Sequence, residues 1–120
     1  MVYRARFVIP VDRPPMENGW LTVGGGRILA LGRGASGEAQ EEDLGDVALL
    51  PGLVNAHTHL ELSDLGGRVP YVGSFAGWIE TLLSEWSERQ PGEQARRQAI
   101  RRGVAESLAA GVTAVGDIGY

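Results

Sequence analysis

Two histidines separated by one residue are the side chains of this sequence best suited to chemistry. They are His57 and His59, the only histidines in the chain, within the run Asn55-Ala56-His57-Thr58-His59. On a β-strand alternate side chains share a face, so both imidazoles can converge on one ion. Neutral imidazole nitrogens bind zinc at roughly 2.0–2.1 Å and also suit iron. The spacing therefore predicts a site for one divalent metal ion, with zinc and iron as the leading candidates.

Three polar residues are candidates for a supporting role around the histidines. Asn55 and Glu61 share the face of the histidines if the strand continues through residue 61, so either could orient a histidine or contact a substrate. An ordinary loop carboxylate is an equally good interpretation of Glu61. Asp117 follows a second predicted strand and reaches the same region by topology. Its alternative role is to close a turn.

The context of the histidine pair strengthens a signal that is weak in isolation. The run Leu53–Ala56 is largely apolar and suits a strand covered on both faces, as in a parallel sheet. Active sites in such folds lie at the carboxyl ends of the strands. The metallo-β-lactamase pattern fits less well, because it needs an aspartate and a histidine where this chain has Leu60-Glu61-Leu62.

The first fifty residues have the pattern of a β unit. Alternating apolar residues and turn-forming clusters predict four strands, two loops and a glycine turn that permits positive φ. The predicted strands are Tyr3–Ile9, Trp20–Val23, Arg27–Leu31 and Val47–Leu50; the loops are Pro10–Gly19 and Gly32–Asp46; the turn is Gly24–Gly26.

From residue 51 the pattern changes to strand, loop, helices and strand. A polar, glycine-rich stretch runs to Gly73, and Ser74 is placed to cap the first helix. Pro91 suits the first turn of a second helix, Gly111 terminates it, and Val112–Val115 is a strand. The first helix carries an apolar stripe expected to pack in the core, formed by Phe75, Trp78, Ile79, Leu82, Leu83 and Trp86. The order predicts an α/β fold with a right-handed crossover and a parallel sheet.

Composition excludes several classes of function. The chain has no cysteine, which rules out disulfides, thiolate ligands and a cysteine nucleophile. The net charge is −4, which disfavours nucleic-acid binding. No apolar run approaches the roughly 18 residues of a membrane span, and the N-terminus lacks the pattern of an export signal. We therefore expect a cytoplasmic protein.

Three segments together resemble one known family. The string Pro51-Gly52-Leu53-Val54-Asn55-Ala56-His57-Thr58-His59-Leu60-Glu61 resembles the first barrel strand of the amidohydrolase superfamily, in its cytosine-deaminase and chlorohydrolase-related branch. The segment 17–32 is similar to the N-terminal β hairpin of that branch. The segment 110–117 resembles its second barrel strand. The resemblance covers most of the chain in the order of the family.

The resemblance implies a TIM-like (β/α)8 barrel preceded by a small β-sandwich subdomain. Residues 1–50 would be the N-terminal part of the sandwich, and residues 51–120 the first strand, helices and second strand of an incomplete barrel. It further implies a divalent metal held by His57 and His59. The family takes its remaining ligands from later strands, and a barrel needs about 250 residues.

The implied activity is hydrolysis of carbon–nitrogen bonds other than peptide bonds. A metal-activated water would deaminate an amino-substituted heterocycle or open a cyclic amide. The substrate would be a small nitrogen heterocycle or nucleoside derivative, and the enzyme a possible homo-oligomer. The run from Asn55 to Ser63 is similar to members proposed to deaminate aminofutalosine. A non-catalytic fragment or self-associating interaction module is the alternative for the chain alone.

Overall fold

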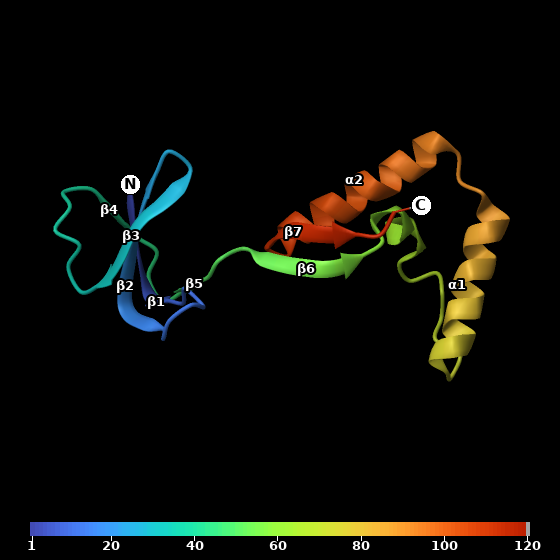
Figure 1. The fold of residues 1–120 in the computed structure, drawn as a ribbon, viewed down its shortest axis with the longest axis horizontal. Helices are drawn as coiled ribbons and strands as arrows, with labels where there is room; N and C mark the ends of the chain where they lie inside the picture. Colours follow the sequence, from blue (N-terminus) through green and yellow to red (C-terminus); the bar gives the residue numbers. More distant parts are fainter. Residues whose placement is uncertain (120) are drawn as a thin grey trace. The chain divides into compact units, whose positions relative to one another are not determined.

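The chain forms two compact units in a computed structural model that describes residues 1–119. The first unit spans Met1–Pro51 and the second Gly52–Tyr120. Each has its own sheet (Figure 1).

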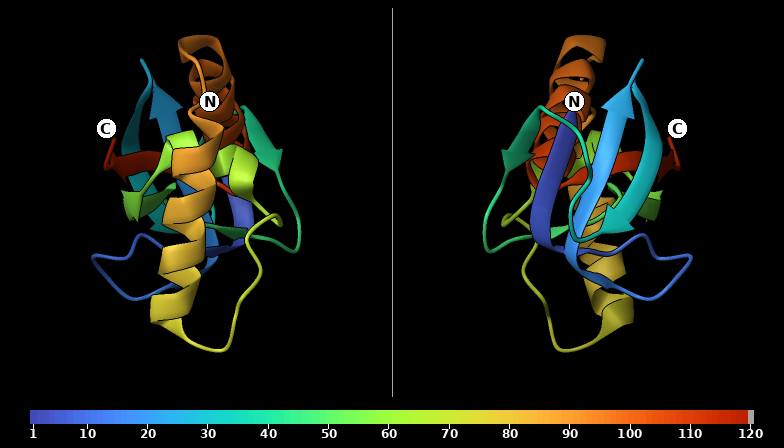
Figure 2. Two further views of the ribbon diagram at one scale, coloured as in Figure 1. Left: turned by 90° about the vertical axis from the view of Figure 1, so that its right-hand side faces the viewer. Right: turned by 90° about the vertical axis from the view of Figure 1, so that its left-hand side faces the viewer.

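The first unit is a five-stranded sheet built around its N-terminal strand. In the order β3-β2-β1-β4, β1 pairs antiparallel with β2 and parallel with β4, and the short β5 also pairs parallel with β1 (Figure 2, right). The strands are β1 (Val2–Val8), β2 (Met16–Gly24), β3 (Arg27–Arg33), β4 (Glu41–Asp43) and β5 (Ala48–Leu49). The β2–β3 hairpin turns at Gly25 and Gly26, whose φ angles of 57° and 72° confirm the predicted glycine turn.

The buried residues of this unit differ from the predicted alternation. Val2, Ala5 and Val8 are buried, whereas Tyr3 and Phe7 are half-buried. Val2 and Val8 share one face of β1 and Ala5 lies on the other, so buried residues occur on both faces of this strand.

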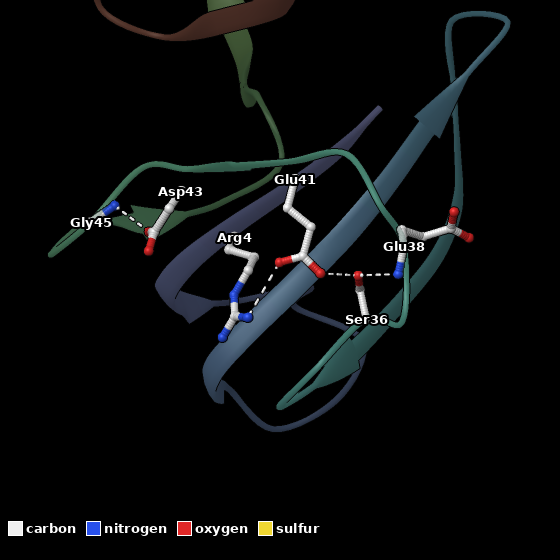
Figure 3. Close-up of polar contacts among 6 residues, drawn as sticks. All are labelled: Arg4, Ser36, Glu38, Glu41, Asp43 and Gly45. Carbon is white, nitrogen blue, oxygen red and sulfur yellow. Dashed lines mark hydrogen bonds and ion pairs between the residues drawn. The ribbon is translucent and has the colours of Figure 1, made fainter.

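Two predicted loops contain strands. β2 begins at Met16, four residues before the predicted start, because Met16 and Glu17 pair with Val8 and Phe7 across the hairpin. The acidic loop after Gly32 contains β4, which an ion pair between Arg4 and Glu41 attaches to β1 at 3.2 Å (Figure 3). Backbone pairing with β1 thus makes an edge strand of a polar segment that has low strand propensity, and the ion pair adds a side-chain contact.

The second unit is a strand–helix–strand unit, as predicted. β6 and β7 pair in parallel, and α2 runs alongside them (Figure 1). The elements are β6 (Leu53–Thr58), the 3-10 helix η1 (Leu60–Leu65), α1 (Phe75–Arg89), α2 (Glu93–Ala109) and β7 (Val112–Asp117). The predicted glycine-rich loop therefore starts with a short helix.

The helix ends follow local capping chemistry. The Ser74 hydroxyl accepts a hydrogen bond from the Gly77 N–H at 3.1 Å, which confirms the predicted cap of α1. Gly111 has φ of 79° just after α2, as expected of a helix-terminating glycine. Pro91 was expected in the first turn of α2, but it precedes the N-cap residue Gly92 and so lies outside the helix.

The predicted core packing is only partly present. No α1 residue is buried, and Phe75 is 72% exposed, while Trp78 and Trp86 are half-buried. β6 was expected to be covered on both faces, yet Val54 is 70% exposed. Among residues 1–119 the buried contact of α2 involves Ala99 and Gly103. The described chain thus leaves most of its apolar stripes uncovered. None of its helices is both long and apolar enough to cross a bilayer.

Candidate metal centre

The two histidines lie at the carboxyl end of β6 with their rings side by side. His57 belongs to the strand, and His59 directly follows it as the N-cap residue of η1. Their ring centroids are 5.1 Å apart, with an interplanar angle of 76°. Rings at this separation lie on the same side of the chain. The structure therefore brings together the two side chains that the sequence singled out.

A β-bulge lies at the histidine pair. Asn55 pairs with Val115 and Thr58 pairs with Asp117, so β6 has one residue more than β7 between these positions. Bulges of this kind bend a strand and redirect its side chains, often beside active sites. The Asn55 side-chain oxygen accepts a hydrogen bond from the His57 backbone N–H at 3.3 Å. Asn55 therefore supports the backbone of His57 at the bulge.

The ring of His59 is held by the strand that follows α2. His59 Nδ1 lies 2.8 Å from the carbonyl oxygen of Ile118. A carbonyl can only accept, so Nδ1 carries the proton, and the lone pair of the neutral ring is then on Nε2. A histidine whose second nitrogen donates to a backbone carbonyl has the arrangement typical of metal ligands. This hydrogen bond fits His59 to a metal ion bound through Nε2.

Asp117 lies beside the histidines but contacts the backbone. Its Oδ1 accepts a hydrogen bond from the Leu60 N–H at 2.9 Å. Leu60 is the first residue of η1, and the N-cap residue His59 forms no side-chain cap. Asp117 therefore satisfies a helix N–H that would otherwise lack a partner.

Glu61 does not share the face of the histidines as a strand residue. β6 ends at Thr58, and Glu61 lies in the first turn of η1. It is the one buried charged residue of the described chain, with 3% of its surface exposed, and its Oε1 has no hydrogen-bond partner. The prediction that an extended strand aligns it with the histidines is wrong, because the chain turns into a 3-10 helix.

The donor set fits a divalent ion but is incomplete in this chain. Within residues 1–119, no three histidine, cysteine or acidic side chains cluster tightly enough to hold a metal. Two imidazoles suit zinc and iron, while a catalytic zinc site ordinarily takes three protein ligands. The chain can therefore supply two ligands of a larger set.

Sequence reasoning missed one partner of the pair and did not predict one close approach near it. The Ile118 carbonyl contributes backbone only, so its side-chain type gives no signal. Gly103 of α2 is buried against η1, where a Cβ would collide with the Ser63 hydroxyl and lie 3.0 Å from Leu60 Cδ2. A glycine inside an otherwise regular helical pattern is the available signal of such a close approach.

Residues 48–120 match the amidohydrolase family over more than half of the chain. The chain belongs to the amidohydrolase family. This match includes the strand that carries both histidines and the second parallel strand, so it covers the site described above.

Individual relatives align with segments of this chain that differ in length. A 5-methylthioadenosine/S-adenosylhomocysteine deaminase of Nitratidesulfovibrio vulgaris (strain Miyazaki F) is 32% identical over 111 residues, which are 88% of this chain and 25% of that protein. An adenosine deaminase of Helicobacter pylori (strain ATCC 700392 / 26695) is 37% identical over 70 residues, 58% of this chain and 16% of that protein.

A solved amidohydrolase structure has the same arrangement of elements. The zinc complex of atrazine chlorohydrolase from Arthrobacter aurescens TC1 is 27% identical, with a TM-score of 0.77 over 97% of this chain and 28% of that chain. The chain therefore spans about a quarter of the length of the two relatives that cover most of it.

Proposed function

We propose that this chain is the N-terminal part of a metal-dependent amidohydrolase that deaminates an amino-substituted nitrogen heterocycle. Residues 1–50 belong to its small β-sandwich subdomain, and residues 51–120 begin its (β/α)8 barrel. His57 and His59 bind one divalent ion, zinc or iron. The observation that carries the proposal is the hydrogen bond between His59 Nδ1 and the Ile118 carbonyl, 2.8 Å long, beside the His57 ring 5.1 Å away.

The protein residues of this site bind and orient. His57 and His59 present imidazole nitrogens, and the Ile118 carbonyl accepts the hydrogen of His59 Nδ1. Asn55 holds the bulge that directs His57. A divalent ion at this position supplies Lewis-acid activation of water near neutral pH. The remaining ligands and the proton-transferring group come from outside the described residues.

The relatives favour a nucleoside derivative as the substrate. Two of them are deaminases of adenosine or of 5-methylthioadenosine and S-adenosylhomocysteine, and the structural relative is a chlorohydrolase bound to zinc. All three names include a compound that contains a nitrogen heterocycle. Deamination of a purine nucleoside derivative is therefore the first reaction to test, and hydrolysis of a cyclic amide is the second.

Replacing His57 tests the ligand assignment. In the intact enzyme, His57→Ala should abolish tight zinc retention and deaminase turnover, because the site loses one of the two imidazole ligands that this chain supplies. Metal content after gel filtration and ammonia release from adenosine and 5-methylthioadenosine are the two measurements. Gln94→Ala on exposed α2 is the control and should leave both unchanged.

Two results would contradict the proposal at different levels. A His57→Ala variant that retains stoichiometric zinc and full turnover would refute the ligand assignment. A zinc-loaded wild-type enzyme that releases no ammonia from either nucleoside, but opens a cyclic amide, would refute deamination and leave the metal site standing.

A further inference from the structure

We infer that Asp117 is a positioning residue that sets the direction of the His59 ring by holding the backbone of Leu60. This inference rests on the proposed metal site and deepens it, since it assigns a role to a residue that does not contact the ion. It follows from three hydrogen bonds that join the end of β6 to the end of β7.

The three bonds involve consecutive residues on each side. The Ile118 N–H donates to the Thr58 carbonyl at 2.8 Å, the Ile118 carbonyl receives His59 Nδ1 at 2.8 Å, and Asp117 Oδ1 receives the Leu60 N–H at 2.9 Å. Residues 58–60 are thus attached at three successive points to residues 117–118. The side chain of Asp117 supplies one of these attachments, and the backbone of Ile118 supplies the other two.

Asp117 holds one end of the peptide group that follows His59, and the Leu62 N–H, which donates to the His59 carbonyl at 3.0 Å, holds the other. His59 has φ of −130° and ψ of 85°, between the strand and the 3-10 helix, and it forms no side-chain cap of its own. Without an acceptor for the Leu60 N–H, ψ of His59 loses a constraint, and the ring turns with the backbone that bears it. The hydrogen bond between His59 Nδ1 and the Ile118 carbonyl then loses its alignment.

A purely structural ion pair does not explain Asp117. Among residues 1–119 it takes part in no salt bridge, and its carboxylate accepts from a neutral backbone N–H. The role therefore needs an acceptor oxygen at this position, and it does not need the charge. That distinction separates Asp117→Asn, which keeps an acceptor of the same length, from Asp117→Ala, which removes it.

Zinc affinity of the intact enzyme tests this role. Chelator competition with Zn²⁺ should show Asp117→Ala binding about 10–100-fold more weakly than wild type, the usual effect of losing an orienting partner. Asp117→Asn should bind zinc as wild type does. Nitrogen NMR of the metal-free histidines should show loss of the fixed Nδ1–H tautomer of His59 in Asp117→Ala alone.

The outcomes separate this inference from the proposed function. If Asp117→Ala keeps wild-type zinc affinity while His57→Ala loses zinc, the positioning role is overturned and the metal site stands. If both keep zinc, the metal site itself is wrong. Equal losses in Asp117→Asn and Asp117→Ala would also overturn the acceptor role. Should Asp117→Ala fail to fold, Asp117→Ser replaces it with the same expected loss, because its hydroxyl is one bond short of the carboxylate oxygen.

Discussion

One carboxylate fastens the edge strand β4 to the rest of the first sheet. Glu41 accepts hydrogen bonds from the hydroxyl of Ser36 and the guanidinium of Arg4 (Figure 3). The hydrogen bond from Ser36, followed by that from Arg4, holds the pKa of Glu41 below its ordinary value. A carboxyl whose pKa is lower in the folded than in the unfolded state stabilises the fold above its unfolded pKa. That contribution disappears as the pH falls through the folded pKa.

Removal of the serine hydroxyl should raise the pKa of Glu41 toward its ordinary value. The variant Ser36→Ala lacks the strongest donor to the carboxylate, so Glu41 should take up its proton at a higher pH than in wild type. Carboxyl carbon NMR of Glu41 across an acid titration measures the change. Ser36→Thr keeps a hydroxyl and should retain the low pKa. An unchanged Glu41 pKa in Ser36→Ala would contradict the assignment.

At the residue scale, the sequence reveals functional groups whose partners are local. The pairing of His57 with His59, and the cap at Ser74, both depend on residues two or three positions apart. The bonds that orient the site are not local, since Ile118 and Asp117 lie more than fifty residues from the groups they contact. Spacing rules predict contacts between residues close in the sequence. Contacts between distant residues can be predicted only when the register of the two parallel strands is known.

Among the elements, the contact between α2 and η1 depends on the absence of a side chain. Gly103 is buried in α2, and a Cβ there would collide with the Ser63 hydroxyl. Ser63 in turn donates to the Leu60 carbonyl at 2.7 Å. The close approach therefore seats η1, and the residue after His59, directly on the helix.

An alanine at this position should separate the two helices. Overpacking typically costs 1–3 kcal/mol, and the better helix propensity of alanine offsets part of it, so Gly103→Ala should lower the free energy of unfolding by about 1 kcal/mol. Urea denaturation measures this change. Ser63→Ala in the same chain removes the colliding hydroxyl and should recover part of the loss. A Gly103→Ala variant more stable than wild type would show that α2 and η1 accommodate the added methyl group without strain.

Elements with strong local patterns were predictable, and elements created by pairing were not. The sequence predicts α1 from its apolar stripe and its N-cap serine. It predicts β7 from a run that contains β-branched residues. β4 has the sequence Glu41-Glu42-Asp43 and forms a strand only because β1 offers it a parallel edge. The sequence predicts a loop where the 3-10 helix η1 lies, because six residues are too few to establish a helical period.

For the molecule as a whole, uncovered apolar surface is the dominant feature. Leu53 and Val54 of β6 are 55% and 70% exposed, and Leu108 of α2 is 61% exposed. Exposed strand edges beside apolar patches favour association with other chains. In a closed barrel, further strands and helices would cover these positions.

The isolated 120-residue chain should therefore self-associate. Multi-angle light scattering after size-exclusion chromatography should give a mass above that of one chain, and Val54→Arg should shift the protein toward monomer by placing a charge on the uncovered strand. Val11→Arg is the matched control, because Val11 is 77% exposed but lies in a loop. A monomeric wild-type chain at high concentration would contradict this expectation.

Closure into a barrel was beyond what periodicity could predict. A parallel pair of strands with a helix beside it begins both open sheets and barrels, so the order of elements alone leaves the two architectures equal. The string from Pro51 to Glu61 favours a barrel only through its resemblance to a barrel family, and the closed barrel stays a prediction.

The hydrogen bond between His59 and Ile118 has a consequence for protein synthesis. The two partners are 59 residues apart, so the ribosome makes both imidazoles well before the carbonyl that orients one of them. At about 5–20 residues per second the delay is roughly 3–12 s. During this interval the His59 ring lacks the carbonyl that fixes its Nδ1 hydrogen. In the proposed metal site, the orientation of His59 would therefore be set only after β7 has been translated.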